Sequence, residues 1–250
     1  MFHGEPTGHV PRGTETIPHP QGPPRIYGGS PASMPQEQLQ AAREALELGL
    51  TALEYGREPA TVDRLAQLAI LLASWAPRMN LTGHRGADQI ARRLILDALA
   101  LIRVLPDFGT LADLGSGAGF PGLPIAILFP DRSVLSVESR SRRVSFQKTV
   151  VRELGLENVT ILLGRIQELD PVEADGVVAQ AVAPPERVLD LMLPWCRSGG
   201  WLAIPGTPDS LAPPPAPAPS YSNVEELRYR VPLEGPERRV WLAKKLAPRS

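Results

Sequence analysis

The stretch LADLGSGAGFPGLPIA, residues 111–126, places four glycines within eight residues, directly after an apolar run. These glycines are Gly115, Gly117, Gly119 and Gly122. A chain that leaves a buried strand and enters a helix at once needs a sharp turn, and glycine adopts the positive φ angles that such turns require. Glycine also leaves room for a ligand against the backbone. The stretch therefore predicts a strand, a ligand-binding turn and a helix with Pro121 in its first turn.

The glycine spacing alone leaves the ligand open. Gly117, Gly119 and Gly122 match the dinucleotide fingerprint G-x-G-x-x-G literally, which is weak evidence by itself. Glu138 narrows the choice, because it follows Gly115 by twenty-three positions and ends the next predicted strand. A carboxylate at that edge of a parallel sheet can accept hydrogen bonds from both hydroxyls of a ribose. A dinucleotide and S-adenosylmethionine both carry such a ribose.

Asp113, two positions before Gly115, helps to distinguish between these two ligands. A dinucleotide lays its pyrophosphate on a helix N-terminus, whereas S-adenosylmethionine has no phosphate and presents its amino-acid end to the loop. Asp113 suits a positively charged neighbour better than a phosphate. A terminal pair of antiparallel strands, predicted at 224–232 and 238–246, also fits the seven-stranded sheet of methyltransferases. A nicotinamide-dependent oxidoreductase rests only on the glycine pattern and lacks an evident Tyr-Lys or His-Asp constellation.

Composition changes along the 250 residues predict three parts. Residues 1–35 hold eight prolines and six glycines without hydrophobic periodicity, which predicts a disordered tail. Apolar residues at helical spacing predict an N-terminal helical extension over 36–106, with helices starting at a Ser33 cap and after Pro59, and a third at 87–104. Residues 107–250 alternate short apolar strands with helices, which is typical of a mainly parallel, helix-covered sheet. The expected strands are 110–114, 133–138, 159–163, 175–181 and 200–204; the expected helices lie near 121–128, 140–154 and 185–197; and 205–220 is expected to be a proline-rich loop.

The composition is that of an ordinary soluble protein, with 43% hydrophobic and 21% charged residues and a formal net charge of −1. No apolar run reaches the ~18–20 residues that span a bilayer, and no secretory signal is evident, so we expect a cytoplasmic protein without a membrane partner. The single cysteine, Cys196, is expected to be a buried structural thiol. Three of the four histidines lie in the tail, so no metal site is expected. A basic nucleic-acid footprint would have to be local, and Arg140, Arg142 and Arg143 are the candidates.

Four segments in order resemble one family. They are MNLTG (79–83), LILDALAL (94–101), LADLGSGAGFPGLPIAILFPD (111–131) and VESRSRRVSFQKTVVRELGLENVTILLGRIQEL (137–169). Together they resemble the bacterial 16S ribosomal RNA guanine-N7 methyltransferases, RsmG or GidB, over residues 36–246. The resemblance implies a Rossmann-like class I methyltransferase with a mainly parallel seven-stranded sheet and an N-terminal helical layer. It also implies S-adenosylmethionine as cofactor and methylation of a guanine N7 in the 16S ribosomal RNA of the small subunit.

The resemblance completes the expected site. It implies that Gly115, Gly117 and Phe120 hold the cofactor, that Glu138 takes the ribose, and that Ile166 and Gln167 flank the adenine. With the contributions argued above, the predicted cofactor site is Asp113, Gly115, Gly117, Phe120, Glu138, Ile166, Gln167 and Gln180. The predicted RNA contacts are Arg140, Arg142 and Arg143. No catalytic residue is assigned, because guanine N7 already carries its lone pair in the neutral base, and proximity can drive the displacement.

Several positions depart from the family pattern, although Asp97 is kept. A histidine is replaced by Leu94, a serine by Ala98, an arginine by Gln180, a lysine by Pro205 and a histidine by Arg239. Losing two cations, at Gln180 and Pro205, could weaken the hold on a cofactor carboxylate or an RNA phosphate, since each charge-assisted bond contributes ~1.5–3 kcal/mol. These departures leave an alternative open: a diverged binding protein that keeps the fold and the cofactor without methylating ribosomal RNA.

Overall fold

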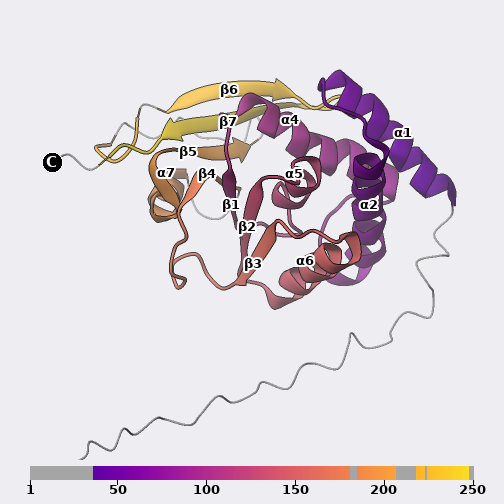
Figure 1. Cartoon of the computed structure of the whole chain (residues 1–250), viewed down its shortest axis with the longest axis horizontal. Coiled ribbons are helices and arrows are strands. Elements are labelled where there is room, and N and C mark those ends of the chain that lie inside the picture. Colours follow the sequence, from indigo (N-terminus) through magenta and orange to yellow (C-terminus); the bar gives the residue numbers. More distant parts are fainter. Residues whose placement is uncertain (1–35, 181–184, 207–217, 223, 248–250) are drawn as a thin grey trace, which may run out of the picture. The chain divides into compact units, whose positions relative to one another are not determined.

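Seven strands form one sheet at the centre of the computed structural model, which describes residues 36–180, 185–206, 218–222 and 224–247 (Figure 1). The strands are β1 (Thr110–Leu114), β2 (Ser133–Glu138), β3 (Val159–Leu163), β4 (Ala174–Ala179), β5 (Cys196–Gly206), β6 (Glu225–Arg230) and β7 (Glu237–Lys244). Their order across the sheet is β3-β2-β1-β4-β5-β7-β6. The first five strands pair in parallel, and β7 runs antiparallel to both β5 and β6.

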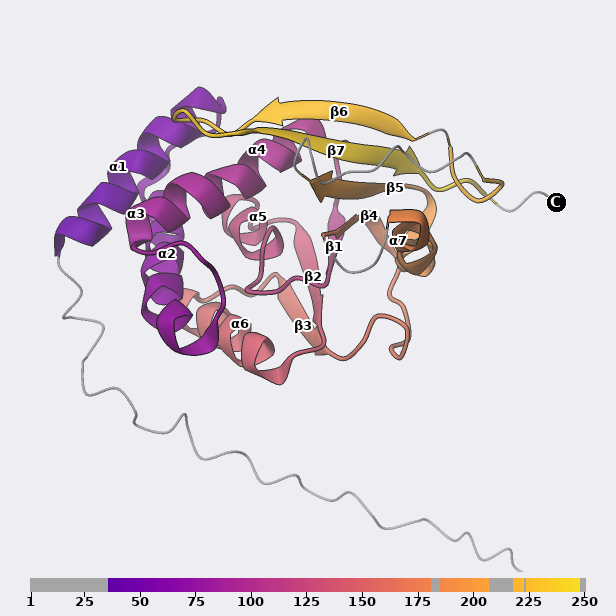
Figure 2. The same cartoon turned by 180° about the vertical axis from the view of Figure 1, so that it is seen from behind.

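Helices cover both faces of the sheet. They are α1 (Gln36–Ala52), α2 (Pro59–Met79), α3 (Ala87–Ile90), α4 (Leu96–Val104), α5 (Gly122–Leu128), α6 (Ser141–Leu154) and α7 (Pro185–Met192). Helices α4, α5 and α6 lie on one face with α1 and α2 outside them, and α7 lies on the other face (Figures 1 and 2). Helices α1, α2 and α4, which precede β1 in sequence, therefore form the predicted N-terminal layer. Of these, α2 and α4 pack against α5 and α6, which connect strands of the sheet.

Alternation along the strands explains why both faces are apolar. In β1, Leu111 joins the core under the helical layer, while Ala112 and Leu114 join the core on the α7 side. Trp195 and Trp241 are fully buried in this second core. Parallel strands covered on both faces are typically continuous hydrophobic runs, and the buried Asp113 in β1 and Ser136 in β2 are exceptions to that rule.

The predicted elements are largely confirmed. The bounds predicted for the first three strands are those observed, and the terminal antiparallel pair is β6 with β7. The helix predicted at 87–104 contains a π-helical segment at Ala91–Ile95 between α3 and α4. The fifth strand begins at Cys196 rather than at residue 200, because Cys196 pairs with Ala174 ahead of a register shift. The predicted tail at 1–35, its Ser33 cap and most of the 205–220 loop lie outside the described residues.

Candidate active site

The glycine turn closes on itself and on the neighbouring strand. Gly115, Gly117 and Gly119 have φ angles of +73°, +60° and +87°. The backbone N–H groups of Gly115 and Ser116 donate to the Val137 carbonyl at 2.8 and 3.1 Å, which ties the turn to the end of β2. A Cβ built on Gly119 would lie 2.3 Å from Cδ1 of Leu123. The turn therefore requires glycine for its backbone angles and, at Gly119, for space.

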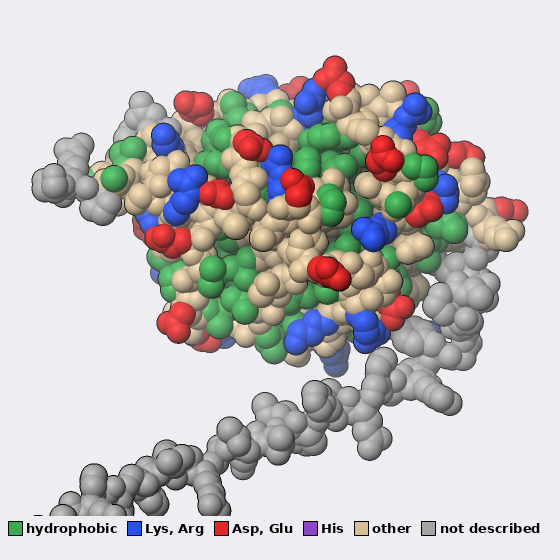
Figure 3. Space-filling model, in the orientation of Figure 1, with side chains coloured by type: hydrophobic (Ala, Val, Ile, Leu, Met, Phe, Trp, Pro, Cys, Tyr) green, Lys and Arg blue, Asp and Glu red, His purple; other side chains and the backbone are tan. Residues whose placement is uncertain are grey.

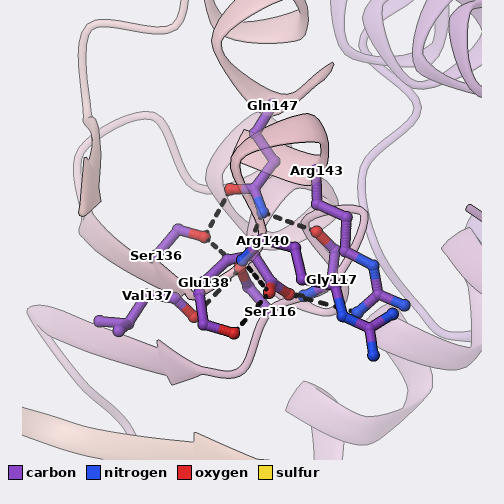
Figure 4. A network of polar contacts seen from close by, with 9 residues as sticks. Ser116, Gly117, Ser136, Val137, Glu138, Arg140, Arg143 and Gln147 are labelled. Atoms are coloured by element: carbon purple, nitrogen blue, oxygen red, sulfur yellow. Dashed lines mark hydrogen bonds and ion pairs between the residues drawn. The ribbon is translucent and has the colours of Figure 1, made fainter. Parts of the chain in front are cut away.

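Glu138 ends β2 with its carboxylate pointing at the turn, and only 4% of the residue is exposed (Figure 4). Its Oε2 accepts the Gly117 N–H at 2.9 Å and lies 3.3 Å from Nη1 of Arg143. Its Oε1 accepts the Arg140 N–H at 2.8 Å and the Ser139 hydroxyl at 3.3 Å. These contacts fix the carboxylate at the position predicted for a ribose acceptor.

A buried polar network under the turn was missed by the sequence analysis. The Gln147 amide on α6 donates to Ser116 Oγ and to the Gly117 carbonyl, each at 2.8 Å, and accepts the Ser136 hydroxyl at 2.6 Å (Figure 4). Ser136 Oγ also lies 2.7 Å from Ser116 Oγ. One signal was present in the sequence: Gln147 lies at helical spacing between Val144 and Val150 on the apolar stripe of α6. The structure buries it fully, and a buried polar side chain needs a partner. Gln147 thus holds the Gly117 carbonyl, while Glu138 accepts the N–H of the same residue.

Asp113 lies beneath the turn with 1% of the residue exposed. Its Oδ2 accepts the N–H of Gly122 at 2.9 Å, at the start of α5. Burial raises the pKa of Asp113 from 3.8 to about 7; the Gly122 N–H lowers it, and the charge of Glu138 raises it further. The structure thus places Asp113 where it holds the first helical turn in position.

The other predicted cofactor residues lie at the same edge of the sheet. Ile166 and Gln167 occupy a turn shortly after β3. Just before this turn, the Gly164 N–H donates to the Glu138 carbonyl at 3.1 Å and so links the segment to the end of β2. Gln180 directly follows β4. The strand order therefore places Ile166 and Gln167, then Glu138, then the glycine turn and then Gln180 along this edge.

The predicted RNA-contacting arginines flank the start of α6. Arg140 and Arg142 are exposed, whereas the Arg143 side chain is 29% exposed and forms an ion pair with Glu138. Acidic and basic side chains are interspersed over the face in Figure 3, and several basic ones gather at the margin where α6 lies in Figure 1. The site thus has local positive charge beside Glu138.

A cavity of about 170 Å³ lies beyond the glycine turn, where β4 and β5 end. Phe120 and Pro121 of the turn form part of its wall. Four of the five positions that depart from the family pattern also line it: Leu94, Ala98, Gln180 and Pro205. The fifth, Arg239, forms an ion pair with Glu226 at 3.0 Å.

The polar part of this cavity is built around Asp97 at the start of α4. Its Oδ1 accepts the Tyr229 hydroxyl at 2.9 Å, and its Oδ2 accepts Nε–H of Arg238 at 2.9 Å. Burial, with the nearby Asp97 charge, raises the pKa of Tyr229, so the phenol stays protonated and donates. Residues 132 and 141 positions away in sequence therefore converge on one carboxylate.

The residues present suit S-adenosylmethionine. A Cβ on Gly117 would come only within 3.7 Å of Arg143 Nη1, so the bare backbone there leaves space that a ligand can fill. A carboxylate at the end of β2 provides the acceptor that ribose hydroxyls need. In the described ranges, no group of three or more metal-ligating side chains is placed to hold a metal ion. No described helix is both long and apolar enough to cross a membrane.

A seven-stranded sheet with this order, a glycine turn after β1 and an acid at the end of β2 define a Rossmann-like class I methyltransferase. The family model GidB, rRNA small subunit methyltransferase G, matches residues 61–210. The "Ribosomal RNA small subunit methyltransferase G" of Aromatoleum aromaticum is 37% identical, over 78% of this chain and 95% of its own length. The protein of the same name in Halorhodospira halophila is 38% identical, over 69% and 79% of the two chains. The chain belongs to this methyltransferase G family.

One solved structure gives a further comparison: a SAM-dependent methyltransferase from Aquifex aeolicus, with a TM-score of 0.47 and 19% identity over 63% of this chain and 93% of that chain. Family membership confirms the predicted resemblance, and the observed sheet confirms the predicted fold class. The chain is an S-adenosylmethionine-dependent methyltransferase, as predicted, and the nicotinamide alternative is set aside.

Proposed function

We propose that this chain methylates N7 of a guanine in the 16S ribosomal RNA of the small ribosomal subunit. The observation that carries the proposal is the junction of the two half-sites at the glycine turn: Glu138 lies on one side, and the cavity walled by Phe120 lies on the other. Such a junction lets a methyl donor and a flat acceptor base meet. The named activity of the relatives supports the same reaction.

The strand order gives the cofactor a direction along the sheet edge. Neighbouring strands lie ~4.8 Å apart, so the distance from β3 to β1 is on the order of 10 Å. We assign Ile166 and Gln167 to the adenine and Glu138 to the ribose. Gly115, Gly117 and Phe120 then hold the amino-acid end, and Gln180 lies beside the acceptor. Asp113 acts as a positioning residue, because its carboxyl accepts the Gly122 N–H beneath the turn.

The chemistry needs orientation more than acid or base catalysis. S-adenosylmethionine supplies, when bound, a methyl group on a positively charged sulfur, which is already an activated electrophile. Guanine N7 offers a lone pair without losing a proton. The residues of this chain therefore act by holding both partners close and in line, which is worth ~7–11 kcal/mol in well-oriented systems. No described residue is needed as a general base.

We assign Arg140 and Arg142 to RNA phosphates, because both are exposed beside the ribose position. Arg143 was predicted to join them, but its ion pair with Glu138 favours a role in fixing that carboxylate. We propose a cytoplasmic location, because the proposed substrate is ribosomal RNA. We also retain residues 36–106 as a helical extension on a cofactor-binding domain at 107–250, preceded by a tail at 1–35.

The test is methyl transfer from labelled S-adenosylmethionine to small ribosomal subunits from a strain that lacks its own enzyme. We expect label in 16S ribosomal RNA at one guanine, with the N7 position shown by selective strand cleavage at the methylated base. Calorimetry with the cofactor runs in parallel. Tight cofactor binding without transfer, under conditions where an established family member works, would contradict the proposal and favour the diverged binding protein.

A further inference from the structure

The cavity beyond the glycine turn, called the acceptor-side cavity from here on, is lined by charged as well as apolar side chains. Its volume of about 170 Å³ suits a single flat base, since clefts for drug-sized ligands measure about 300–1,000 Å³. Leu94, Ala98 and Pro205 make part of its wall apolar, while Asp97 and Arg238 face it as an ion pair. The Arg238 and Asp97 side chains are 24% and 20% exposed, so this ion pair is part-buried and presents polar atoms to the cavity.

Asp97 is held with acceptor capacity to spare. Each of its oxygens accepts one hydrogen bond, from Tyr229 or from Arg238, whereas an ionised carboxylate has about four lone-pair positions. The side chain remains 20% exposed, so a ligand in the cavity can reach it. The two fixed donors orient both oxygens, and one further lone pair remains on each.

Arg93 adds a donor to the same cavity. It lies in the π-helical segment Ala91–Ile95, an irregularity that is frequent at functional sites. Its Nη1 is buried and has no hydrogen-bond partner among the residues that the structure describes. A buried guanidinium donor without a partner is rare and indicates that a ligand completes its hydrogen bonding. The cavity thus offers two adjacent acceptors at Asp97 and an unused donor at Arg93.

We propose that this cavity recognises the Watson–Crick edge of the target guanine, with Asp97 accepting the N1–H and an N2–H and with Arg93 donating to O6; the inference rests on the proposed function. Guanine is the base that presents two adjacent donors beside one acceptor on that edge. Adenine has a lone pair at N1, which the Asp97 carboxylate would repel. Recognition of guanine in this way identifies specificity-determining residues for the reaction.

The same arrangement leaves the reacting atom free. N7 lies on the five-membered ring, away from the N1 and N2 edge, and is therefore open to the wall that Phe120 and Pro121 contribute. As the N7–methyl bond forms and the sulfur–methyl bond breaks, the electron pair of the broken bond stays on sulfur and the positive charge passes to the base. A fixed carboxylate beside that base stabilises the arriving charge.

The test compares guanine with inosine at the methylated position in reconstituted small subunits. Inosine lacks the N2 amine, so we expect the wild-type protein to prefer guanine by about 10- to 100-fold in kcat/KM, the effect of one charge-assisted hydrogen bond. Asp97→Asn keeps the shape but loses the charge and one acceptor. We expect it to lower kcat/KM for guanine by a similar factor and to reduce the ratio of guanine to inosine to the part intrinsic to the bases.

Asp88→Asn is the matched control, because Asp88 lies on α3 and pairs with the neighbouring Arg92. It should retain the wild-type ratio, and both variants should bind the cofactor as the wild type does. A merely structural role for Asp97 would lower transfer to both bases equally and keep the ratio, which would overturn the inference. A wild-type ratio near one, or undiminished transfer to 1-methylguanosine, would overturn it without any variant. Absence of transfer to guanine itself would instead refute the proposed function.

Discussion

Asp113 offers a stability measurement that tests the architecture beneath the glycine turn. Burial raises the pKa of Asp113 from 3.8 to about 7 in the folded protein. Each factor of ten in acid dissociation corresponds to about 1.4 kcal/mol, so this rise is equivalent to ~4 kcal/mol. Asp113→Asn replaces the titrating carboxyl with a neutral group of similar shape that can still accept the Gly122 N–H. The substitution should therefore remove a pH-dependent penalty.

The sign follows from proton binding in the two states. Below pH 4, Asp113 is protonated in both states and contributes no pH dependence. Between about pH 4 and 7 the unfolded chain releases this proton while the folded protein keeps it, so the wild-type free energy of unfolding falls as pH rises. Above about pH 7 both states are ionised. Between pH 4 and pH 8, the free energy of unfolding of the wild type should thus fall by up to ~4 kcal/mol relative to that of Asp113→Asn.

Urea denaturation followed by tryptophan fluorescence, at several pH values for both proteins, measures this difference directly. Asp175→Asn is an informative comparison, because its hydrogen bond from Arg197 chiefly lowers the pKa of Asp175, with the Thr110 and Gly109 N–H groups adding to the effect. Its stabilising contribution is present above about pH 4 and is lost as pH falls, which is the opposite sign. A flat difference between wild type and Asp113→Asn from pH 4 to pH 8 would refute the reasoning.

Three further predictions concern the same site. Glu138→Ala should weaken S-adenosylmethionine binding by about 100-fold, because two charge-assisted hydrogen bonds to the ribose are lost. Calorimetry measures the affinity, the circular dichroism spectrum should be unchanged, and Glu153→Ala at an exposed position is the control. Equal affinities of the wild type and Glu138→Ala would put the ribose elsewhere. Gly155→Ala, just after α6, should lower the free energy of unfolding by ~1–2 kcal/mol, because φ is +61° and the space around it is open. Gly119→Ala should lower it by at least ~1 kcal/mol more, because its Cβ would also clash with Leu123. Urea denaturation measures both losses, and equal losses would contradict the packing at Gly119. Gln147→Leu should cost ~2 kcal/mol or more, because it leaves the Gly117 carbonyl without its side-chain donor and removes one hydrogen-bond partner from Ser116 and from Ser136; full stability would show that the network is dispensable.

Most of the fold could be predicted from local sequence, because its elements are short and clearly bounded. The apolar runs of β1 and β2 end at a glycine turn and at an acid, and both boundaries are visible in the sequence. The π-helical segment at Ala91–Ile95 was not predictable in this way, since its apolar spacing resembles that of an ordinary helix. The early start of β5 was missed because pairing with β4, not local propensity, determines it.

The site divides in the same way. Glu138 and the glycines could be predicted because their chemistry follows from their position after a strand. The network of Ser116, Ser136 and Gln147 joins side chains 11 to 31 positions apart, and only the folded sheet brings them together. The partners of Asp97 lie still further away in sequence. Polar contacts of that range leave no local pattern beyond an isolated buried polar residue.

Four of the five departures from the family pattern lie on one side of the glycine turn, and the contacts of Glu138 lie on the other. Leu94, Ala98, Gln180 and Pro205 all lie on the cavity side of the glycine turn, whereas Glu138 and its partners lie on the β2 side. We therefore expect changes around the cavity to alter the binding of the target base and to leave the contacts that we assign to the ribose unchanged. Arg93 and Arg238 remain on the cavity side as cations, although the usual ones at Gln180 and Pro205 are gone. It follows that restoring a cation at Gln180 should change transfer to RNA more than it changes the fold, because Gln180 is exposed and lies just after β4, outside its pairing with β1 and β5.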